Sequence, residues 1–181
     1  YQPPGLWEAV SFSADFSSQI YVQSKGEDLY RRGLYTYWKR SLPYPSLITF
    51  DAPNREVCTV QRQRTSTPLQ ALVLMNDPVF LEAARGLAQR IVTEGGDDIS
   101  EKLNFAFRLT LARRPTKTET KLLKKIYRDQ LQNFRKDKKA AQDFVKIGES
   151  AVPKNLDESE LAAWMAVGNI LLNLDETITK G

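Results

Sequence analysis

The chain has 181 residues, a formal net charge of +4, no histidine and one cysteine. Without histidine these residues hold no Ser–His–Asp triad, no histidine-ligated zinc and no C-x-x-C-H haem attachment, and one cysteine allows no internal disulfide. Hydrophobic residues make up 41% of the chain, which is enough for one domain with a core, and no apolar run is long enough to span a membrane. The chain does not begin with Met and shows no leader pattern, so we expect a fragment or a processed form.

Residues 1–66 are predicted to form an irregular strap rich in aromatic side chains. A helix is expected over residues 29–40, weakened by Gly33. Residues 41–56 then follow as an extended segment, because Pro43 and Pro45 stop that helix. The aromatic side chains alternate with arginines and lysines, which allows two interpretations. They bind nucleic acid or carbohydrate, or they pin an irregular segment to the rest of the protein.

The segment from Arg64 to Val92 is predicted to supply the centre of the fold. Thr67 and Pro68 are typical of a helix start, and the residues that follow are apolar nearly all round, as in a buried helix. Asn76-Asp77-Pro78 should end this helix and start a second one. We therefore expect the Thr67 helix to lie in the interior.

Four further helices are predicted from N-terminal capping residues and apolar periodicity. They start after Asp98, Thr116, Asp137 and Asp157. The first runs to about Ala112, the second has an apolar stripe from Leu122 to Phe134, the third is ended by Gly148, and the last runs to about Asn173. The predicted fold class is mainly α, with five or six helices in a single domain made of the strap (1–66) and a helical body (67–181).

Charge is concentrated in residues 113–139, which hold eleven Lys or Arg against three acidic residues. The candidate basic face consists of Lys121, Lys124, Lys125 and Arg128. Such a helix is able to bind a polyanion. Alternatively, these cations form only the solvated face of an amphipathic helix.

A second candidate surface lies in the link from Phe50 to Gln70, where charged side chains precede the Thr67 helix. It consists of Asp51, Arg55, Glu56, Arg62 and Arg64. Guanidinium groups there could bind an anion or another ligand. In the alternative interpretation they satisfy loop carbonyls and pair with the two acids. The lone Cys58 is predicted to be a buried, inert thiol.

Four segments resemble a family of unknown function, the planctomycete-type domain at the C-terminal end of large, cytochrome-c-associated exported proteins. They are YRRGLYTYWKR, FDAPNREVCTVQRQRTSTPLQALVLMNDPVFLEAARGLAQR, FRLTLARRPTKTE and ELAAWMAVGNILLNLDETITK. The resemblance extends over essentially the whole chain, with Gln61 and Ser66 as small departures. It implies an extracytoplasmic location, a haem c group in an attached module of the parent protein, and a chain that is the C-terminal part of a larger family domain.

The resemblance supplies no catalytic, cofactor-binding or metal-binding residue to carry over to this chain. Three hypotheses therefore stay open: a non-catalytic helical interaction or scaffold domain, the non-haem portion of an extracytoplasmic oxidoreductase acting on a polysaccharide or another extracellular substrate, and a polyanion-binding module. The expected partners are other domains of the same parent protein and an anionic polysaccharide. Nucleic acid is not expected, because no known nucleic-acid-binding motif accompanies the basic residues.

Overall fold

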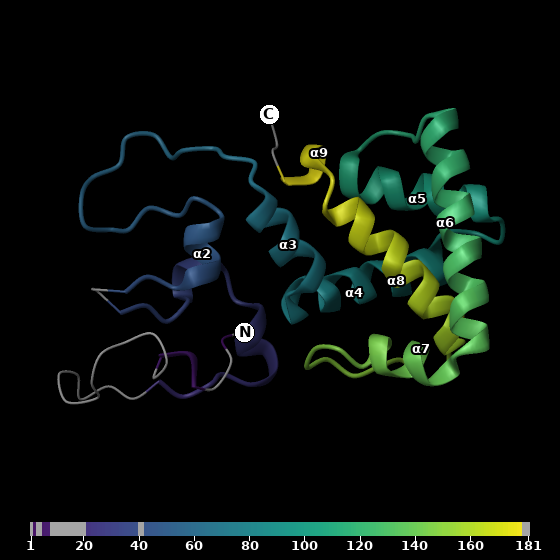
Figure 1. Cartoon of the computed structure of the whole chain (residues 1–181), viewed down its shortest axis with the longest axis horizontal. Coiled ribbons are helices and arrows are strands. Elements are labelled where there is room, and N and C mark those ends of the chain that lie inside the picture. Colours follow the sequence, from purple (N-terminus) through teal and green to yellow (C-terminus); the bar gives the residue numbers. More distant parts are fainter. Residues whose placement is uncertain (1, 3–4, 8–20, 40–41, 179–181) are drawn as a thin grey trace. The chain divides into compact units, whose positions relative to one another are not determined.

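The computed structural model describes residues 2, 5–7, 21–39 and 42–178 (Figure 1). This part of the chain contains eight α-helices and no β-strand, which confirms the mainly α fold class. It divides into two compact units, residues 1–70 and 71–181, which we describe separately and call unit 1 and unit 2. Among the described residues, none of the helices combines the length and hydrophobicity needed to span a lipid bilayer.

Most of unit 2 is helical. Helix α3 (Pro68–Asn76) begins in unit 1 and continues into unit 2. The following helices are α4 (Pro78–Glu94), α5 (Ile99–Leu111), α6 (Lys117–Lys136), α7 (Lys138–Val145), α8 (Glu158–Leu172) and the short α9 (Asp175–Ile178). Six helices of eight or more residues thus follow Thr67, as the sequence predicted.

The predicted capping residues start these helices. The side chains of Asp77, Asp98, Thr116, Asp137 and Asp157 each accept a hydrogen bond from a backbone N–H in the first turn of the next helix. Glu101 and Glu119 complete reciprocal capping boxes with Asp98 and Thr116. The helix after Asp137 ends at Val145 rather than at Gly148. These caps satisfy backbone donors that have no partner within the helix.

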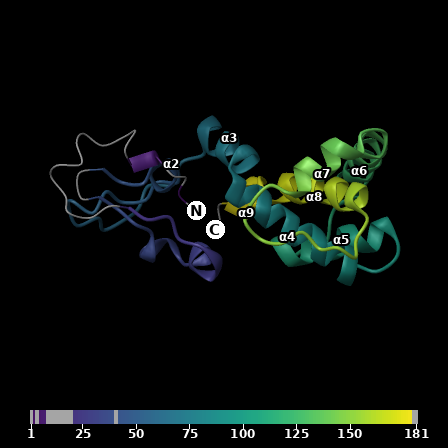
Figure 2. The same cartoon turned by 90° about the horizontal axis from the view of Figure 1, so that it is seen from below.

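Helix α8 is the buried centre of unit 2. It packs against α4, α6 and α7, and Figure 2 shows it between α6 and α7 on one side and α4 and α5 on the other. Its side chains are buried around nearly the whole helix, including Trp164, whose ring lies 4.4 Å from that of Tyr127. At Gly168 an added Cβ would lie 3.1 Å from the Ala84 carbonyl oxygen, so glycine permits the close approach of α4.

The prediction of a buried Thr67 helix was wrong. In α3 the side chains of Leu69, Leu72 and Met75 are 55%, 59% and 54% exposed, and Leu74 is the buried apolar residue. An all-round apolar composition shows that a helix suits an interior, but it does not decide which of two such helices is enclosed. Helix α8 has the small residues Ala162, Ala163 and Gly168, which let neighbouring backbones approach on several sides.

A buried arginine joins α4 to the loop after α7. Arg85 is 1% exposed, and its guanidinium group donates to the carbonyl oxygens of Val145, Ile147 (3.0 Å) and Ser150 (2.8 Å). Glu82, one turn earlier, accepts the backbone N–H groups of Glu149 (2.8 Å) and Ser150 (3.0 Å). This pair satisfies a loop whose polar groups would otherwise be unpaired beside the core.

Unit 1 is less regular. Its described elements are two 3₁₀-helices, η2 (Gly26–Tyr30) and η3 (Gly33–Tyr35), the helix α2 (Pro45–Thr49) and the start of α3. The prediction of one helix over residues 29–40 was wrong for the described residues 29–39, and that of an extended segment over 41–56 was wrong for residues 45–49, which form α2. Residues 40 and 41 lie outside the described part of the chain. Pro45 stands in the first turn of α2, where a missing N–H has no cost, so it starts a helix here.

An aromatic cluster stabilises unit 1. Trp7 is 1% exposed, and its ring lies 5.1 Å from that of Tyr37 and 6.5 Å from that of Tyr21. The Trp7 indole N–H donates to Gln2 Oε1 at 2.9 Å, and Gln2 Nε2 donates to the Tyr37 carbonyl oxygen at 3.0 Å. These aromatic residues therefore pin the irregular segment together. Tyr30 and Tyr35 are instead exposed, and Phe12 and Phe16 lie outside the described residues.

The burial of α8, in place of the α3 helix that the sequence predicted to be interior, gives a first prediction. Leu161→Ala should lower the free energy of unfolding by about 2–5 kcal/mol, because it leaves a cavity beside α8. Leu72→Ala should change it by less than about 0.5 kcal/mol, because Leu72 is largely in water. Urea unfolding followed by circular dichroism measures both. Equal losses would contradict the assignment of α8 as the interior helix.

The Arg85 contacts give a second prediction. Arg85→Met introduces an apolar side chain of similar length that has no hydrogen-bond donors. It should therefore lower the free energy of unfolding by about 3 kcal/mol. Arg90→Met, on the exposed side of the same helix, removes an ion pair with Glu94 that water screens, so it should cost much less. Thermal unfolding of the two variants compares them, and a loss for Arg85→Met no greater than for Arg90→Met would refute the proposed role of Arg85.

Candidate functional site

The Phe50–Gln70 link of unit 1 is organised by Asp51. Its carboxylate accepts the backbone N–H of Thr65 at 2.8 Å and the Thr65 hydroxyl at 2.9 Å. Gln70 is buried, and its amide donates to the Thr49 carbonyl oxygen at 2.8 Å and to Thr65 Oγ1 at 3.1 Å. These bonds hold the two ends of the intervening loop, residues 52–64, close together, as in an Ω-loop.

Two further features fix the base of this loop. Arg62 donates to the backbone carbonyl oxygens of Asp51 (2.7 Å) and Phe50. Asp51 itself has a φ of 59°, in the left-handed region that non-glycine residues rarely adopt. The hydrogen bonds from Thr65 hold the pKa of the Asp51 carboxyl below its ordinary value. The guanidinium group of Arg62 therefore satisfies loop carbonyls, as one of the two sequence interpretations required.

The other candidate residues of the link lie apart from this base. The Arg55 guanidinium carbon stands 4.5 Å from the centre of the Trp38 ring, and Trp38, Asn54, Arg55 and Glu56 line a hollow of about 470 Å³. We call this feature the Trp38 hollow. Arg64 is exposed and has no hydrogen-bond or ion-pair partner among the described residues. The structure thus brings Arg55 and Glu56 together, and Asp51 and Arg62 together, as two separate groups.

The prediction of a buried thiol was wrong, because Cys58 is exposed. It lies in the loop between Val57 and Thr59, where every residue from Pro53 to Leu69 is exposed. The general tendency of free cysteine to be interior does not apply in a loop that lies outside the core. In the described part of the chain no group of three or more His, Cys, Asp or Glu side chains is placed to hold a metal ion.

The exposed cations on one face of α6 differ from the predicted set. Lys121, Lys125 and Arg128 are exposed, but Lys124 is half-buried and donates to the hydroxyl of Ser100 on α5. Exposed cations that share the face are Lys117, one turn before Lys121, and Arg135, two turns after Arg128. Sequence reasoning missed both, although the helical period of 3.6 residues would have found them.

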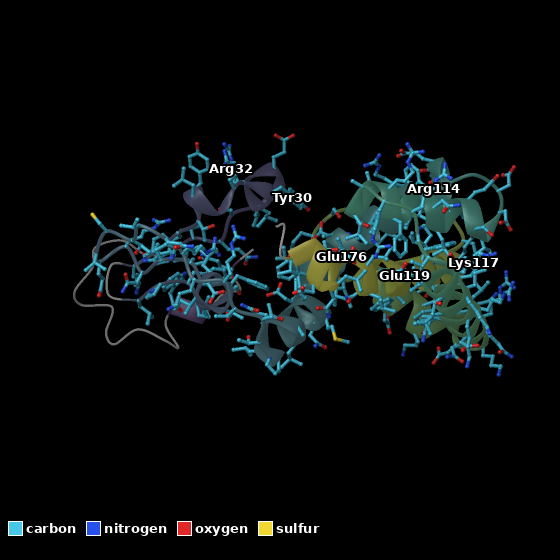
Figure 3. All side chains as sticks on the ribbon, turned by 90° about the horizontal axis from the view of Figure 1, so that it is seen from above. Tyr30, Arg32, Arg114, Lys117, Glu119 and Glu176 are labelled. Carbon is cyan, nitrogen blue, oxygen red and sulfur yellow. The ribbon has the colours of Figure 1, made fainter. Side chains whose placement is uncertain are left out.

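We call this set the basic stripe: Lys117, Lys121, Lys125, Arg128 and Arg135. Its members follow one another at intervals of four, four, three and seven residues, so they keep to one side of α6 over about 27 Å. None of the five forms an ion pair or a hydrogen bond with another described residue. Asp129, one turn after Lys125, borders the stripe. Figure 3 labels Lys117, which lies at the start of the stripe.

The inward side of α6 shows why the stripe faces water. Leu123 and Tyr127 are buried, and Tyr127 packs on Trp164 of α8, where burial raises the pKa of its hydroxyl to about 12. Phe134 stacks with Phe144 of α7, with 5.7 Å between the ring centres. Leu122 precedes Leu123 in the sequence but lies outside this inward side and is exposed. Both aromatic rings of α6 thus belong to the core.

An ion-pair network anchors the N-terminal end of α6. Arg113 pairs with Glu119 at 2.7 Å and with Glu176 of α9 at 2.8 Å, and Figure 3 labels both acids. Glu119 also accepts the backbone N–H of Thr116 at 2.6 Å. The bond from Arg113, followed by that from Thr116, lowers the pKa of the Glu119 carboxyl to about 2, and the two acids raise the pKa of Arg113.

The fold and these two surfaces define a mainly α protein with a pinned loop in unit 1 and a cationic helix face in unit 2. Residues 2–127 match the PSD1 family, described as proteins of unknown function (DUF1553). Because this match covers more than half of the chain, the protein belongs to that family. The match ends within α6, whereas we expected a resemblance over essentially the whole chain. Comparisons with curated proteins and with solved structures gave no match.

The Glu119 contacts give a third prediction. A carboxyl whose pKa is lowered on folding stabilises the folded state above its ordinary pKa of 4.5, and this stabilisation is lost as the pH falls towards about 2. Near neutral pH, Glu119→Gln should therefore lower the free energy of unfolding by about 1–2 kcal/mol, allowing for solvent screening. Urea unfolding of both proteins between neutral pH and about pH 2 tests this. A difference that does not shrink with acidification would rule out the carboxylate as its cause.

Proposed function

We propose that this protein is a non-catalytic helical interaction domain of a larger exported protein, and that the basic stripe of α6 binds an anionic polysaccharide. The observation that carries the proposal is the alignment of five exposed cations, without ion-pair partners among the described residues, along one helix side. A linear polymer with regularly spaced negative charges is able to contact several of these cations at once. Each contact releases counterions, which makes binding sensitive to salt.

The aromatic side chains of α6 favour a polysaccharide over a single-stranded nucleic acid. Proteins that bind single strands combine cations with exposed aromatic rings, on which the bases stack. In α6 the rings of Tyr127 and Phe134 are instead turned inward, onto Trp164 and Phe144. The stripe therefore offers charge and hydrogen-bond donors without a stacking surface, and this suits sulfate and carboxylate groups on a sugar chain.

The other helices of unit 2 hold α6, and with it the basic stripe, in a fixed position. The position of α6 is determined by Leu123 and Tyr127 in the core and by the Arg113 network at its start. A helix held at several points presents its cations in a fixed order, so less conformational entropy is lost on binding. Other domains of the parent protein are further proposed partners.

The location and the parent protein are also part of the proposal. The family resemblance seen in the sequence supports an extracytoplasmic setting and a haem c group in an attached module of the parent. Detection of the native protein in the exported fraction of its source cells checks the location.

A fourth prediction tests the stripe with two matched triple variants. Lys121→Glu, Lys125→Glu and Arg128→Glu together reverse three charges on the stripe. The control variant carries Arg108→Glu, Lys146→Glu and Lys154→Glu, three exposed cations elsewhere in unit 2 that undergo the same change of net charge. We expect the stripe variant to bind heparin at least about tenfold more weakly and to elute at lower salt, because it loses three charge contacts. The control variant should stay close to the parent protein.

Circular dichroism checks that both variants keep their helices. Equal losses of heparin binding in the two variants would show that only net charge matters, and would contradict a defined stripe. A single-stranded DNA of similar charge serves as the competing probe. If it binds more tightly than heparin at the same salt concentration, the assignment to a polysaccharide is wrong.

A further inference from the structure

The Trp38 hollow in unit 1 has the dimensions of a small-molecule site. Its volume of about 470 Å³ falls within the range of roughly 300–1,000 Å³ that is usual for ligand pockets. The described residues that line it are Trp38, Asn54, Arg55 and Glu56, which combine one large aromatic surface with three polar groups. Such a mixture fixes the orientation of a ligand by hydrogen bonds while an apolar face contributes contact area.

The charges in the hollow indicate the class of ligand. Arg55 and Glu56 are adjacent and of opposite sign, so the charges of the described lining cancel. An anion would be attracted by the guanidinium group and repelled by the neighbouring carboxylate. The hollow therefore differs from the basic stripe, which holds cations only, and it suits a ligand without net charge.

The hydrogen-bonding groups of the hollow also favour a neutral ligand. Arg55 supplies donors, Glu56 supplies acceptors and the Asn54 amide supplies both. Asn54 Oδ1 accepts the Glu56 backbone N–H at 3.2 Å, and its amide nitrogen stands 3.4 Å from Glu56 Oε2, so both side chains keep unused capacity. A pyranose ring is complementary to this set, since its hydroxyl groups both donate and accept and its C–H faces pack on an indole.

The hollow is also organised before a ligand arrives. Arg55 has a φ of 64°, in the left-handed region, and its guanidinium group lies against Trp38. The loop that carries Asn54, Arg55 and Glu56 is closed at its base by the bonds from Thr65 to Asp51 and from Arg62 to the Asp51 carbonyl oxygen. A loop fixed in this way loses little conformational entropy when it binds a ligand.

We propose that the Trp38 hollow binds a neutral pyranose unit of a saccharide chain. The pyranose ring packs against the part of the Trp38 indole that Arg55 leaves uncovered. Glu56 accepts hydrogen bonds from the hydroxyl groups of the sugar, and Arg55 and Asn54 donate hydrogen bonds to them. This inference is independent of the polysaccharide contact proposed for α6, because it rests on other residues in the other unit.

The three tryptophans provide a direct measurement of binding. Trp7 and Trp164 are 1% and 0% exposed, whereas Trp38 is only half-buried, so quenching of indole fluorescence by iodide reports mainly on Trp38. The probes are cellohexaose, maltohexaose and mannohexaose, each titrated to millimolar concentration into the whole chain. We expect at least one of them to protect Trp38 from iodide. An oligogalacturonate of the same length should protect it less, because Glu56 repels its carboxylates.

Variants that keep Trp38 test the polar contacts. Glu56→Ala and Asn54→Ala should each weaken the protecting hexaose about five- to tenfold, since each removes hydrogen bonds to the ring hydroxyls. Arg64→Ala is the matched control, because Arg64 is an exposed residue of the same loop outside the hollow, and it should leave binding unchanged. Circular dichroism and unfolding curves confirm that each variant is folded.

Three results would overturn the inference: no hexaose protects Trp38, the oligogalacturonate protects it better than every neutral hexaose, or the Glu56 and Asn54 variants bind like the parent. The stripe variant of α6 should still bind the neutral hexaose, and the Glu56 variant should still bind heparin. These two crossed measurements separate a failure of this inference from a failure of the proposal for α6.

Discussion

The burial of α8 on nearly all sides is the constraint on which the rest of unit 2 depends. Gly168 lets the backbone of α4 approach, and Trp164 receives the ring of Tyr127 from α6. Because these contacts exclude water from the centre of the unit, each neighbouring helix must turn its apolar side towards α8. The position of every surface residue on α4, α6 and α7 then follows from its angular distance to that apolar side.

The basic stripe is a direct consequence of this arrangement. Since Leu123 and Tyr127 face α8, residues about half a turn away on α6 must face water, and Lys121, Lys125 and Arg128 occupy those positions. Lys124 comes directly after Leu123, at the edge of the buried side, and its chain reaches Ser100 instead. The core thus decides which cations of this lysine-rich helix are available to a partner.

This geometry also explains which features of the fold and of the candidate sites could be predicted from the sequence alone. Capping boxes at Asp98 and Thr116 depend on residues three positions apart, so local patterns located α5 and α6 correctly. The enclosure of α8 rather than α3, and the exposure of Cys58, depend on contacts between distant segments, which a local pattern does not contain. The pairing of Trp38 with Arg55 in one hollow is of the same kind, because seventeen positions and a helix separate the two residues.

The arginines show which surfaces keep binding capacity. Arg85 donates to the carbonyl oxygens of the loop after α7, and Arg62 donates to those of Phe50 and Asp51. Arg113 forms ion pairs with two carboxylates. A guanidinium group whose N–H donors are already satisfied gains little from a ligand, because an existing hydrogen bond must break for each new one. Arg55 lies over the Trp38 ring, and neither Arg55 nor Arg128 has a hydrogen-bond partner among the described residues. Arg55 and Arg128 therefore belong to the arginines whose donors the described part of the chain has not already satisfied, and both lie on surfaces that we propose as binding sites.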